Sequence, residues 1–360
     1  MDVTIVTSDS PALHDFEKKF GCRVFPVEIT RRMSPLRDLL AIWRLACHLR
    51  REKYDIVHAH IPKGGLVGMI AAILAGLPVR IYTLHGLLLE TSTGLKRKLL
   101  WFIEALTCKI ATTVLVVSPS VKKGTLQSKV CPPEKMLMLG NGTACGIDLE
   151  RFNPEKRTLA LRSSTRANLG IPDDAIVAGF VGRIVPDKGI ECLVHAFELA
   201  GNKADNIYMV LVGPVETVRE GISQNLKHRI ERNSHIICTG QVLDIVPLYT
   251  AIDFLVLPSR REGFPYVPIE AAAMGLPSVV SRATGCVDAV VDNVTGLLVD
   301  VDNSGQLCEA ILKLAGDAEL RERLGKNGYE RVSRLFEAKF MIEEHIRFYG
   351  DVAGPQDSRR

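Results

Sequence analysis

The sequence predicts an α/β protein with two Rossmann-like, doubly wound domains that face each other across a crevice. The chain has 360 residues, too long for one ordinary core and about right for two domains. Its first half alternates short β-branched runs with helical patterns, and its second half repeats the alternation after a turn-rich stretch at 141–166. Two such domains place a ligand crevice at the carboxyl ends of their strands.

The first half predicts a domain over residues 1–165. Runs rich in β-branched residues predict strands at 3–7, 56–60, 79–84 and 113–118. Apolar and polar residues at helical spacing predict helices at 35–53, 64–76, 95–110 and 119–128. The stretch that follows contains Gly142, Gly146 and Asn153-Pro154 and then becomes charged, which is typical of the approach to a domain linker.

The second half predicts a domain over residues 166–335. Its predicted strands lie at 176–181, 208–212, 235–239, 254–257 and 278–280. The helix at 189–200 carries Ile190, Leu193, Val194 and Phe197, the three-and-four spacing of a helix that faces a core. The final helices are predicted at 305–315, 317–334 and 336–349. We expect the last one, at about 336–350, to pack back on the first domain.

The cysteine content and the apolar segments indicate the cellular compartment in which the protein works. The nine cysteines are scattered and include no C-x-x-C pair, which favours a reducing cytosol over a disulfide framework or a zinc cluster. No basic, apolar leader opens the chain. The longest apolar run, at 66–77, is shorter than the roughly 20 residues that span a bilayer, so we expect a buried crossover helix there.

Charge is unevenly distributed. Residues 1–166 contain 25 Lys and Arg against 14 Asp and Glu, while the remainder contains 20 against 27. The net charge of +4 therefore combines a basic half of +11 with an acidic half of −7. The basic half is expected to meet an anionic partner: a membrane surface, a phosphorylated lipid or a nucleic acid.

The segment 262–271 is the most informative in the chain. It follows a buried strand and opens a helix, with Glu262 and Gly263 in the turn and Glu270 just inside the helix. A glycine-bearing turn at a helix N-terminus presents free backbone N–H groups and the positive end of the helix dipole, which suits a pyrophosphate. The alternative is a surface loop with incidental acids, since two glutamates at this spacing often occur by chance.

A second segment, 181–190, also joins a buried strand to a helix. It places Arg183 and Lys188 at the carboxyl edge of the sheet, where two cations would neutralise a diphosphate leaving group. Two solvated surface cations are the alternative.

Together these segments resemble the retaining glycosyltransferases of family 4, which have the GT-B fold. The resemblance covers nearly the whole chain and is carried by three motifs in the family's order and spacing. They are G-R-x-x-x-x-K-G from Gly182, S-R-R-E-G-F-P-x-x-x-x-E-A-A-A-x-G-L-P from Ser259, and N-V-T-G-L-L-V from Asn293.

The resemblance assigns a role to each donor-site residue. Arg183 and Lys188 would hold the donor pyrophosphate, Glu270 would accept hydrogen bonds from the ribose hydroxyls, and Glu262 would contact the transferred sugar. The backbone around Gly263, Phe264 and Pro265 would cradle sugar and phosphate, although Pro265 has no N–H. Gly240 lies where the family packs the base. Tyr266 stands where relatives often carry a small polar residue.

In the first half, the resemblance draws attention to the ends of two strands. His85, in a Thr-Leu-His-Gly turn, would lie near the transferred sugar and its acceptor as a hydrogen-bonding positioner; packing alone is the alternative. His58, His60 and Lys63 would belong to the acceptor side. The two histidines share one face of their strand, but we find no third ligand for a metal.

By resemblance, the activity is a retaining hexosyl or N-acetylhexosaminyl transfer from a nucleotide-diphosphate sugar, with a UDP-sugar the expected donor. No enzymic nucleophile is required, because the leaving diphosphate can guide the acceptor hydroxyl onto the same face of the sugar. The protein then stabilises charge on the phosphate and on the sugar. We expect no cofactor and no essential metal, and we interpret Asp300-Val301-Asp302 as a turn.

The chain departs from the family at its start. Members usually begin with a strand, a glycine-rich turn and a helix before the strand that starts here at Val3, so the first domain is expected to lack its first βα unit. An open sheet edge and exposed apolar helix faces would follow.

Two basic, amphipathic segments suggest where the protein works. One runs from Arg31-Arg32 to Lys53 and includes Trp43, and the other runs from Leu95 to Phe102. Such helices can lie on an anionic membrane surface, or can simply pack one face on the sheet and solvate the other. We expect a cytoplasmic protein, peripheral at the inner face of the plasma membrane. Its acceptor would be a glycan or a polyprenyl-diphosphate-linked sugar in surface polysaccharide assembly.

Other functions stay open. A nucleotide-sugar epimerase can share the two-domain architecture, and a donor-binding protein without turnover is compatible with an incomplete first domain. Nucleic-acid binding is disfavoured because no known module is present, and a dehydrogenase is disfavoured because no G-x-G-x-x-G follows a first strand.

Overall fold

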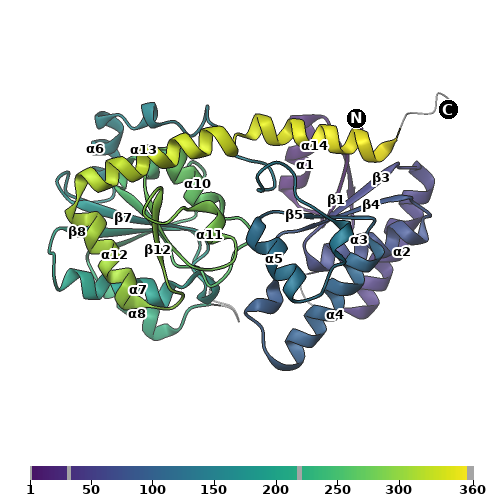
Figure 1. Cartoon of the computed structure of the whole chain (residues 1–360), viewed down its shortest axis with the longest axis horizontal. Coiled ribbons are helices and arrows are strands. Elements are labelled where there is room, and N and C mark those ends of the chain that lie inside the picture. Colours follow the sequence, from purple (N-terminus) through teal and green to yellow (C-terminus); the bar gives the residue numbers. More distant parts are fainter. Residues whose placement is uncertain (1, 31–33, 217–220, 355–360) are drawn as a thin grey trace. The chain divides into compact units, whose positions relative to one another are not determined.

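The computed structural model describes residues 2–30, 34–216 and 221–354, and the chain divides into two compact units (Figure 1). The first unit comprises the chain up to Val116, Lys122–Leu137 and the residues from Arg347 onward. The second comprises Val117–Val121 and Met138–Ile346. Both units contain parallel sheets with helices, so the predicted α/β class is confirmed.

The second unit is built on a six-stranded parallel sheet in the order β12-β11-β10-β7-β8-β9. This is the strand order of doubly wound nucleotide-binding folds. Chain order reverses between β7 and β10, which pair directly through Ala178 and Phe254. In such sheets ligands bind beyond the carboxyl ends of the strands at this reversal.

The strands of this unit are short and largely buried on both faces, as expected for a covered parallel sheet. They are β7 (Ile176–Val181), β8 (Ile207–Val212), β9 (Ile236–Gly240), β10 (Phe254–Leu257), β11 (Ser278–Ser281) and β12 (Gly296–Val299). The helices are α6 (Leu159–Asn168), α7 (Ile190–Gly201), α8 (Gln224–Arg232), α9 (Val246–Ala251), α10 (Tyr266–Ala273), α11 (Cys286–Ala289), α12 (Ser304–Gly316), α13 (Ala318–Leu335) and α14 (Ala338–Ala353). In Figure 1, α7, α8 and α12 lie on one face of the sheet and α10 and α13 on the other.

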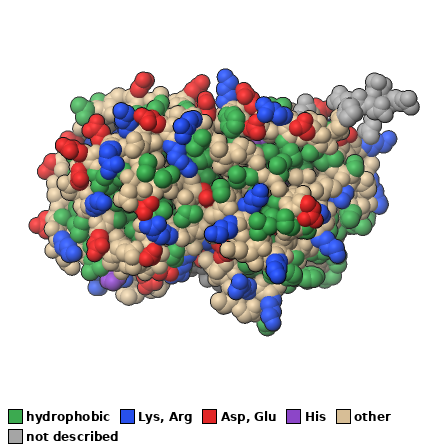
Figure 2. All heavy atoms as spheres, viewed as in Figure 1, with side chains coloured by type: hydrophobic (Ala, Val, Ile, Leu, Met, Phe, Trp, Pro, Cys, Tyr) green, Lys and Arg blue, Asp and Glu red, His purple; other side chains and the backbone are tan. Residues whose placement is uncertain are grey.

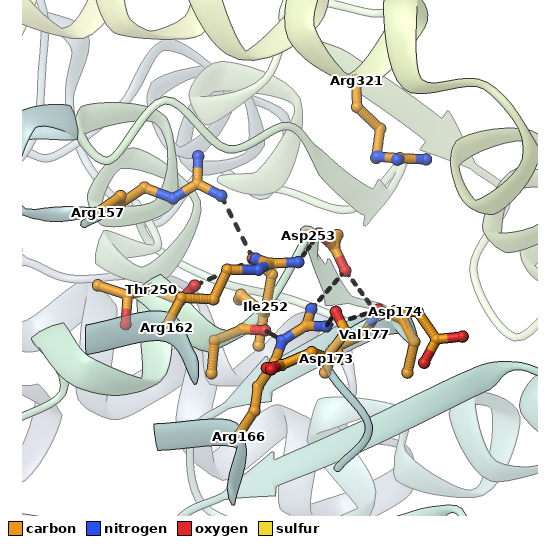
Figure 3. A network of polar contacts seen from close by, with 12 residues as sticks. Arg157, Arg162, Arg166, Asp173, Asp174, Val177, Thr250, Ile252, Asp253 and Arg321 are labelled. Carbon is orange, nitrogen blue, oxygen red and sulfur yellow. Dashed lines mark hydrogen bonds and ion pairs between the residues drawn. The ribbon is translucent and has the colours of Figure 1, made fainter. Parts of the chain in front are cut away.

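A buried ion network ties α6 to the sheet (Figure 3). Arg166 is fully buried, donates to the carbonyl of Ala251 and reaches the carboxylate of Asp253 at 2.9 Å. Asp253 also accepts from Arg162 at 2.6 Å and from the backbone N–H of Val177 at 2.7 Å. Arg162 and Arg166 are thus both paired with Asp253, and pairing is the condition for burying a charge.

The same network helps to locate the division between the units. A boundary near residue 165 was expected, whereas residues 138–165 group with the second unit. Arg162 binds Asp253, and Ile147 forms a backbone bridge with Glu337. The turn-rich stretch is therefore fastened to the second unit by its own hydrogen bonds. The helix expected at about 336–350 is α14, which begins in the second unit and contributes its last residues, from Arg347, to the first.

The first unit contains two parallel sheets, β1-β2 and β3-β4-β5-β6. Their strands are β1 (Thr4–Thr7), β2 (Arg23–Pro26), β3 (Ile56–His60), β4 (Val79–Leu84), β5 (Thr113–Val116) and β6 (Met136–Leu137). The helices are α1 (Pro11–Phe20), α2 (Pro35–Glu52), α3 (Pro62–Leu74), α4 (Gly94–Ile110) and α5 (Pro119–Gln127). Helices α2, α3 and α4 pack side by side, with α3 against β3 and β4 and α4 against β4. The core cluster of α2 includes Val6 of β1 and Phe25 of β2.

The two sheets of this unit are separated by a cavity of about 360 Å³. Val6 and Thr7 of β1 line one side, and Ile56 and His58 of β3 line the other. Among the described residues, β1 pairs only with β2, and β3 pairs only with β4.

A carboxyl is buried where α4 packs on β4. Glu104 is 3 % exposed and accepts a hydrogen bond of 2.5 Å from the Tyr82 hydroxyl. Burial raises the pKa of Glu104 to about 7, although the hydrogen bond acts in the opposite direction.

The structure also bears on the first basic segment and on the long apolar run. Arg31 and Arg32, the start of the first basic segment, lie outside the described residues. No helix in the described part of the chain is long and apolar enough to cross a membrane. Residues 66–74 of the apolar run lie in α3, which buries Val67, Gly68, Met69, Ala71 and Ala72.

Candidate active site

Two loops meet at the reversal point of the second unit's sheet. One follows β7 and carries Arg183 and Lys188, and the other follows β10 and carries Glu262. Lys188 Nζ lies 2.5 Å from Glu262 Oε1, and the two side chains are 23 % and 14 % exposed. The structure therefore joins two predicted site residues that are 74 positions apart in sequence.

The tight path of the first loop depends on glycine. Gly189 has φ +69°, and a Cβ at this position would lie 2.1 Å from the carbonyl oxygen of Pro258. Only glycine lets the start of α7 come so close to the end of β10. Lys188, next to it, is thereby held against the second loop.

Arg183 lies at the same sheet edge and is more accessible. Its side chain is 50 % exposed and donates to Glu216 Oε1 at 2.9 Å. Gly240 ends β9, and its carbonyl accepts from the N–H of Gly213, which follows β8. The loops after β7 and β8 and the end of β9 thus lie along one edge of the sheet, where an extended ligand such as a nucleotide-sugar could bind.

The turn into α10 presents backbone N–H groups. Among the described residues, the amides of Gly263 and Phe264 donate to no protein acceptor, although the Ser118 hydroxyl binds the Gly263 carbonyl at 2.9 Å. The Phe264 side chain is buried and packs edge-on against Phe336 at 5.0 Å, so only its backbone faces a ligand. Pro265 is the N-cap of α10. Free amides at a helix start favour an anion.

Glu270 lies one helical turn further on. Its Oε2 accepts a 2.7 Å hydrogen bond from the hydroxyl of the fully buried Tyr249. Burial raises the pKa of the Glu270 carboxyl above its usual range, while Tyr249 and the nearby Arg151 act in the opposite direction. A shielded, oriented carboxylate of this kind is well suited to accept hydrogen bonds from neutral hydroxyls.

Two other sequence features have internal partners. The Tyr266 hydroxyl accepts from the backbone N–H groups of Ala144 and Cys145, so this side chain fixes a loop of the same unit. Asp302 pairs with Arg260 at 2.9 Å, and Asp300 accepts from Gln306. The D-x-D sequence therefore lies in a turn whose carboxylates are occupied by side chains.

The predicted histidines of the first unit cluster at the ends of β3 and β4. His60 Nδ1 lies 3.0 Å from His85 Nε2. His58 uses both ring nitrogens, with Tyr349 at 2.5 Å and Thr83 at 2.6 Å. His85 is exposed, but partial desolvation by the surrounding protein lowers its pKa, which favours a neutral imidazole that can donate from one nitrogen and accept at the other.

Lys63 follows this cluster and is neutralised by Asp38. Its Nζ lies 2.8 Å from Asp38 Oδ1, and the pair is largely shielded, with 15 % and 18 % exposure. Between His60 and Lys63, the β-branched Ile61 has φ +60°, a conformation that costs about 1–3 kcal/mol and clusters at functional sites. Among the described residues, no group of three or more His, Cys, Asp or Glu could hold a metal ion.

Comparison with known proteins places both units in one family. Residues 1–142 match the model of a glycosyl transferase 4-like domain, and residues 162–331 match that of glycosyl transferases group 1. The capsular polysaccharide biosynthesis glycosyltransferase CapM of Staphylococcus aureus is 33 % identical over 349 residues, which cover 97 % of this chain and 90 % of that one. The chain is a family 4 glycosyltransferase.

Other similarities agree with this assignment. The glycosyltransferase is 27 % identical to an Escherichia coli protein named UDP-Gal:alpha-D-GlcNAc-diphosphoundecaprenol alpha-1,3-galactosyltransferase, covering 94 % of this chain and 88 % of that one. It superposes on HepE of Anabaena, solved in complex with UDP and glucose, with a TM-score of 0.81 at 20 % identity, covering 96 % of this chain and 91 % of HepE. The GT-B fold expected from the motifs is thereby confirmed.

Several partners in this glycosyltransferase were not found from its sequence. Tyr249, Glu216 and Asp38 each pair with a predicted site residue, namely Glu270, Arg183 and Lys63. None belongs to a local motif. Tyr249 lies within the short helix α9, and no pattern around it points to Glu270.

Proposed function

We propose that this glycosyltransferase moves a hexosyl or N-acetylhexosaminyl group from a UDP-sugar to a glycan or lipid-linked acceptor, with retention of anomeric configuration, in polysaccharide biosynthesis. The observation that carries the proposal is the contact between Lys188 and Glu262 at the sheet reversal, beside the free amides of Gly263 and Phe264. Lys188 and the free amides suit a diphosphate, and the carboxylate of Glu262 suits a sugar.

The names of relatives support the choice of donor and acceptor. The galactosyltransferase of Escherichia coli and a Campylobacter jejuni N-acetylgalactosaminyltransferase are both named for acceptors on diphosphoundecaprenol. HepE was solved in complex with UDP-glucose. A lipid-linked acceptor also supports a cytoplasmic site of action at the inner face of a membrane.

The side chains suggest how the reaction proceeds. The bond between the sugar's anomeric carbon and the diphosphate oxygen breaks, and Arg183 with Lys188 stabilises the negative charge that develops on the leaving group. The acceptor oxygen then bonds to the same face of that carbon, and its proton passes to the departing diphosphate. Glu262 stabilises positive charge on the sugar, while neutral His85 positions a hydroxyl. No metal is assigned a role in this proposal.

Retention and donor identity can be measured together. The purified protein is incubated with UDP-glucose, UDP-galactose and their N-acetylated forms, with and without a short polyprenyl-diphosphate-linked sugar. We expect UDP release only with acceptor, and NMR of the product is expected to show the anomeric configuration of the donor. Inverted product contradicts the mechanism. A changed sugar with no transfer identifies an epimerase instead, and donor binding without turnover identifies a binding protein.

A further inference from the structure

Helix α2 is apolar on two opposite faces. Its inner face buries Ala41, Ile42, Leu45, Ala46 and Leu49 in the core. Its outer face exposes Leu36, Leu39, Leu40 and Trp43, with Leu36 84 % and Trp43 63 % accessible. These four residues recur at three-and-four spacing and so form one ridge. The outer face of a surface helix is normally polar, so this ridge requires an explanation.

Helix α4 carries a second ridge of the same kind. Leu95, Leu99 and Phe102 are four and three positions apart, and they are 85 %, 49 % and 59 % exposed. Trp101 beside them is 40 % exposed and is fixed by a 2.7 Å hydrogen bond from its indole N–H to the carbonyl of Ser128. Bulky side chains therefore project from α4 without covering protein.

Cations accompany both ridges. Lys96, Arg97 and Lys98 are exposed in the first turns of α4, and within the described residues none of the three has an ion-pair partner. Arg44 is exposed beside Trp43 on α2. Asp38, an acid near the α2 ridge, is already paired with Lys63. The combined surface is apolar and positive.

The two ridges lie at the same end of one helical layer. Helices α2 and α4 both pack against α3, and the pair of Lys63 and Asp38 joins the start of α3 to the start of α2. Since α3 and α4 follow parallel strands, they begin at the carboxyl edge of the sheet, where His60 and His85 lie. In the view of Figure 2, blue and green side chains lie next to one another over the projection that α4 forms in Figure 1.

We propose that the ridges of α2 (Leu36, Leu39, Leu40, Trp43) and α4 (Leu95, Leu99, Phe102), with the cations beside them, form a docking face for an anionic lipid bilayer. Aromatic and aliphatic side chains enter the headgroup boundary while Lys and Arg neutralise lipid phosphates. A second copy of the chain fits less well, because it would press like charges together. The inference rests on the proposed function in one respect, namely that a lipid-linked acceptor lies in a membrane. The experiment therefore measures membrane binding without donor or acceptor, so that its result does not depend on the proposed reaction.

The test is flotation of the full chain with vesicles of phosphatidylcholine alone, or with added phosphatidylglycerol. We expect binding only to the anionic vesicles, and we expect salt to weaken it. Replacing the cations together (Lys96→Gln, Arg97→Gln, Lys98→Gln) should lower affinity by about fivefold per charge removed. Replacing both leucines (Leu36→Gln, Leu95→Gln) should lower it by about tenfold per residue.

The matched control is Leu159→Gln, because Leu159 is also helical and 82 % exposed but lies in the second unit. UDP affinity should be unchanged in every variant, which shows that each is folded. The proposal is overturned if the wild type ignores anionic vesicles, or if the leucine pair variant binds them as well as the control. It is also overturned if the wild type is a dimer that the leucine substitutions make monomeric while vesicle binding stays the same.

Discussion

Exchanging Glu270 for glutamine tests the donor site most directly. The substitution keeps the shape of the side chain and its hydrogen bond from Tyr249, but it removes the charge. If the carboxylate accepts the two ribose hydroxyls of UDP, each hydrogen bond changes from charge-assisted to neutral. Such a change is worth about 1–1.5 kcal/mol per bond, so UDP affinity should fall by about 30- to 150-fold. Because Glu270 is shielded from solvent, little of this effect should be lost to screening.

Removing its partner should have a smaller effect with a distinct signature. Tyr249→Phe deletes a donor that holds the carboxylate in place, and we expect a loss of about fivefold in UDP affinity. That hydrogen bond also lowers the pKa of Glu270, so its loss should raise the pKa further. UDP affinity falls as Glu270 becomes protonated. The fall should therefore begin at a higher pH in Tyr249→Phe than in the wild type, and it should be absent from Glu270→Gln.

Isothermal titration of UDP across a range of pH measures both effects. Each affinity is expressed relative to Glu322→Gln, which removes the same charge from the exposed surface of α13 and corrects for titration of the UDP phosphate. If Glu270→Gln binds UDP within twofold of this control while remaining folded, the assignment of Glu270 to the ribose is refuted.

Three further predictions follow from contacts in the two units. Glu262→Gln should lower kcat more than it raises the donor KM, and Lys188→Met should lower kcat by about 10²- to 10³-fold. Both effects are measured from initial rates across donor concentrations. Negligible effects of both substitutions would contradict both roles. Asp253→Ala leaves Arg166 buried without its counter-ion and should lower the free energy of unfolding by about 3–5 kcal/mol, and adding Arg166→Met should recover part of that loss in thermal unfolding. Because the pKa of Glu104 is raised from 4.5 to about 7, the folded state binds the extra proton, and stability should fall as pH rises between these values. Glu104→Gln should flatten this slope and gain about 3 kcal/mol above neutral pH, and an unchanged slope in calorimetry would contradict the assignment.

The donor loops could be predicted from sequence because their signals are local. A buried strand, a glycine and a helix follow one another within a few residues around Arg183 and around Glu270. Once strand order is known, the reversal between β7 and β10 brings the two loops together. The contact between Lys188 and Glu262 is thus a consequence of topology acting on two motifs.

The remaining contacts could not be found in this way. Tyr349 reaches His58 across 291 positions, and Tyr249 reaches Glu270 from a separate short helix. Such pairs depend on the exact direction of side chains, which periodicity does not specify. The unit boundary was missed for a related reason. The turn-rich composition of residues 141–166 resembles a linker, but the ion pairs formed by Arg162 and Arg166 attach its end to the sheet.

The order of strands in the second unit also has a consequence for folding. The donor loops become neighbours only when β10 pairs with β7, and two complete strand–helix units, β8 with α8 and β9 with α9, lie between them in the chain. Closing so long a segment is slow compared with forming the helices inside it. The return of UDP binding during refolding should therefore lag behind the return of helical signal. UDP would bind only to chains in which β10 has already paired with β7.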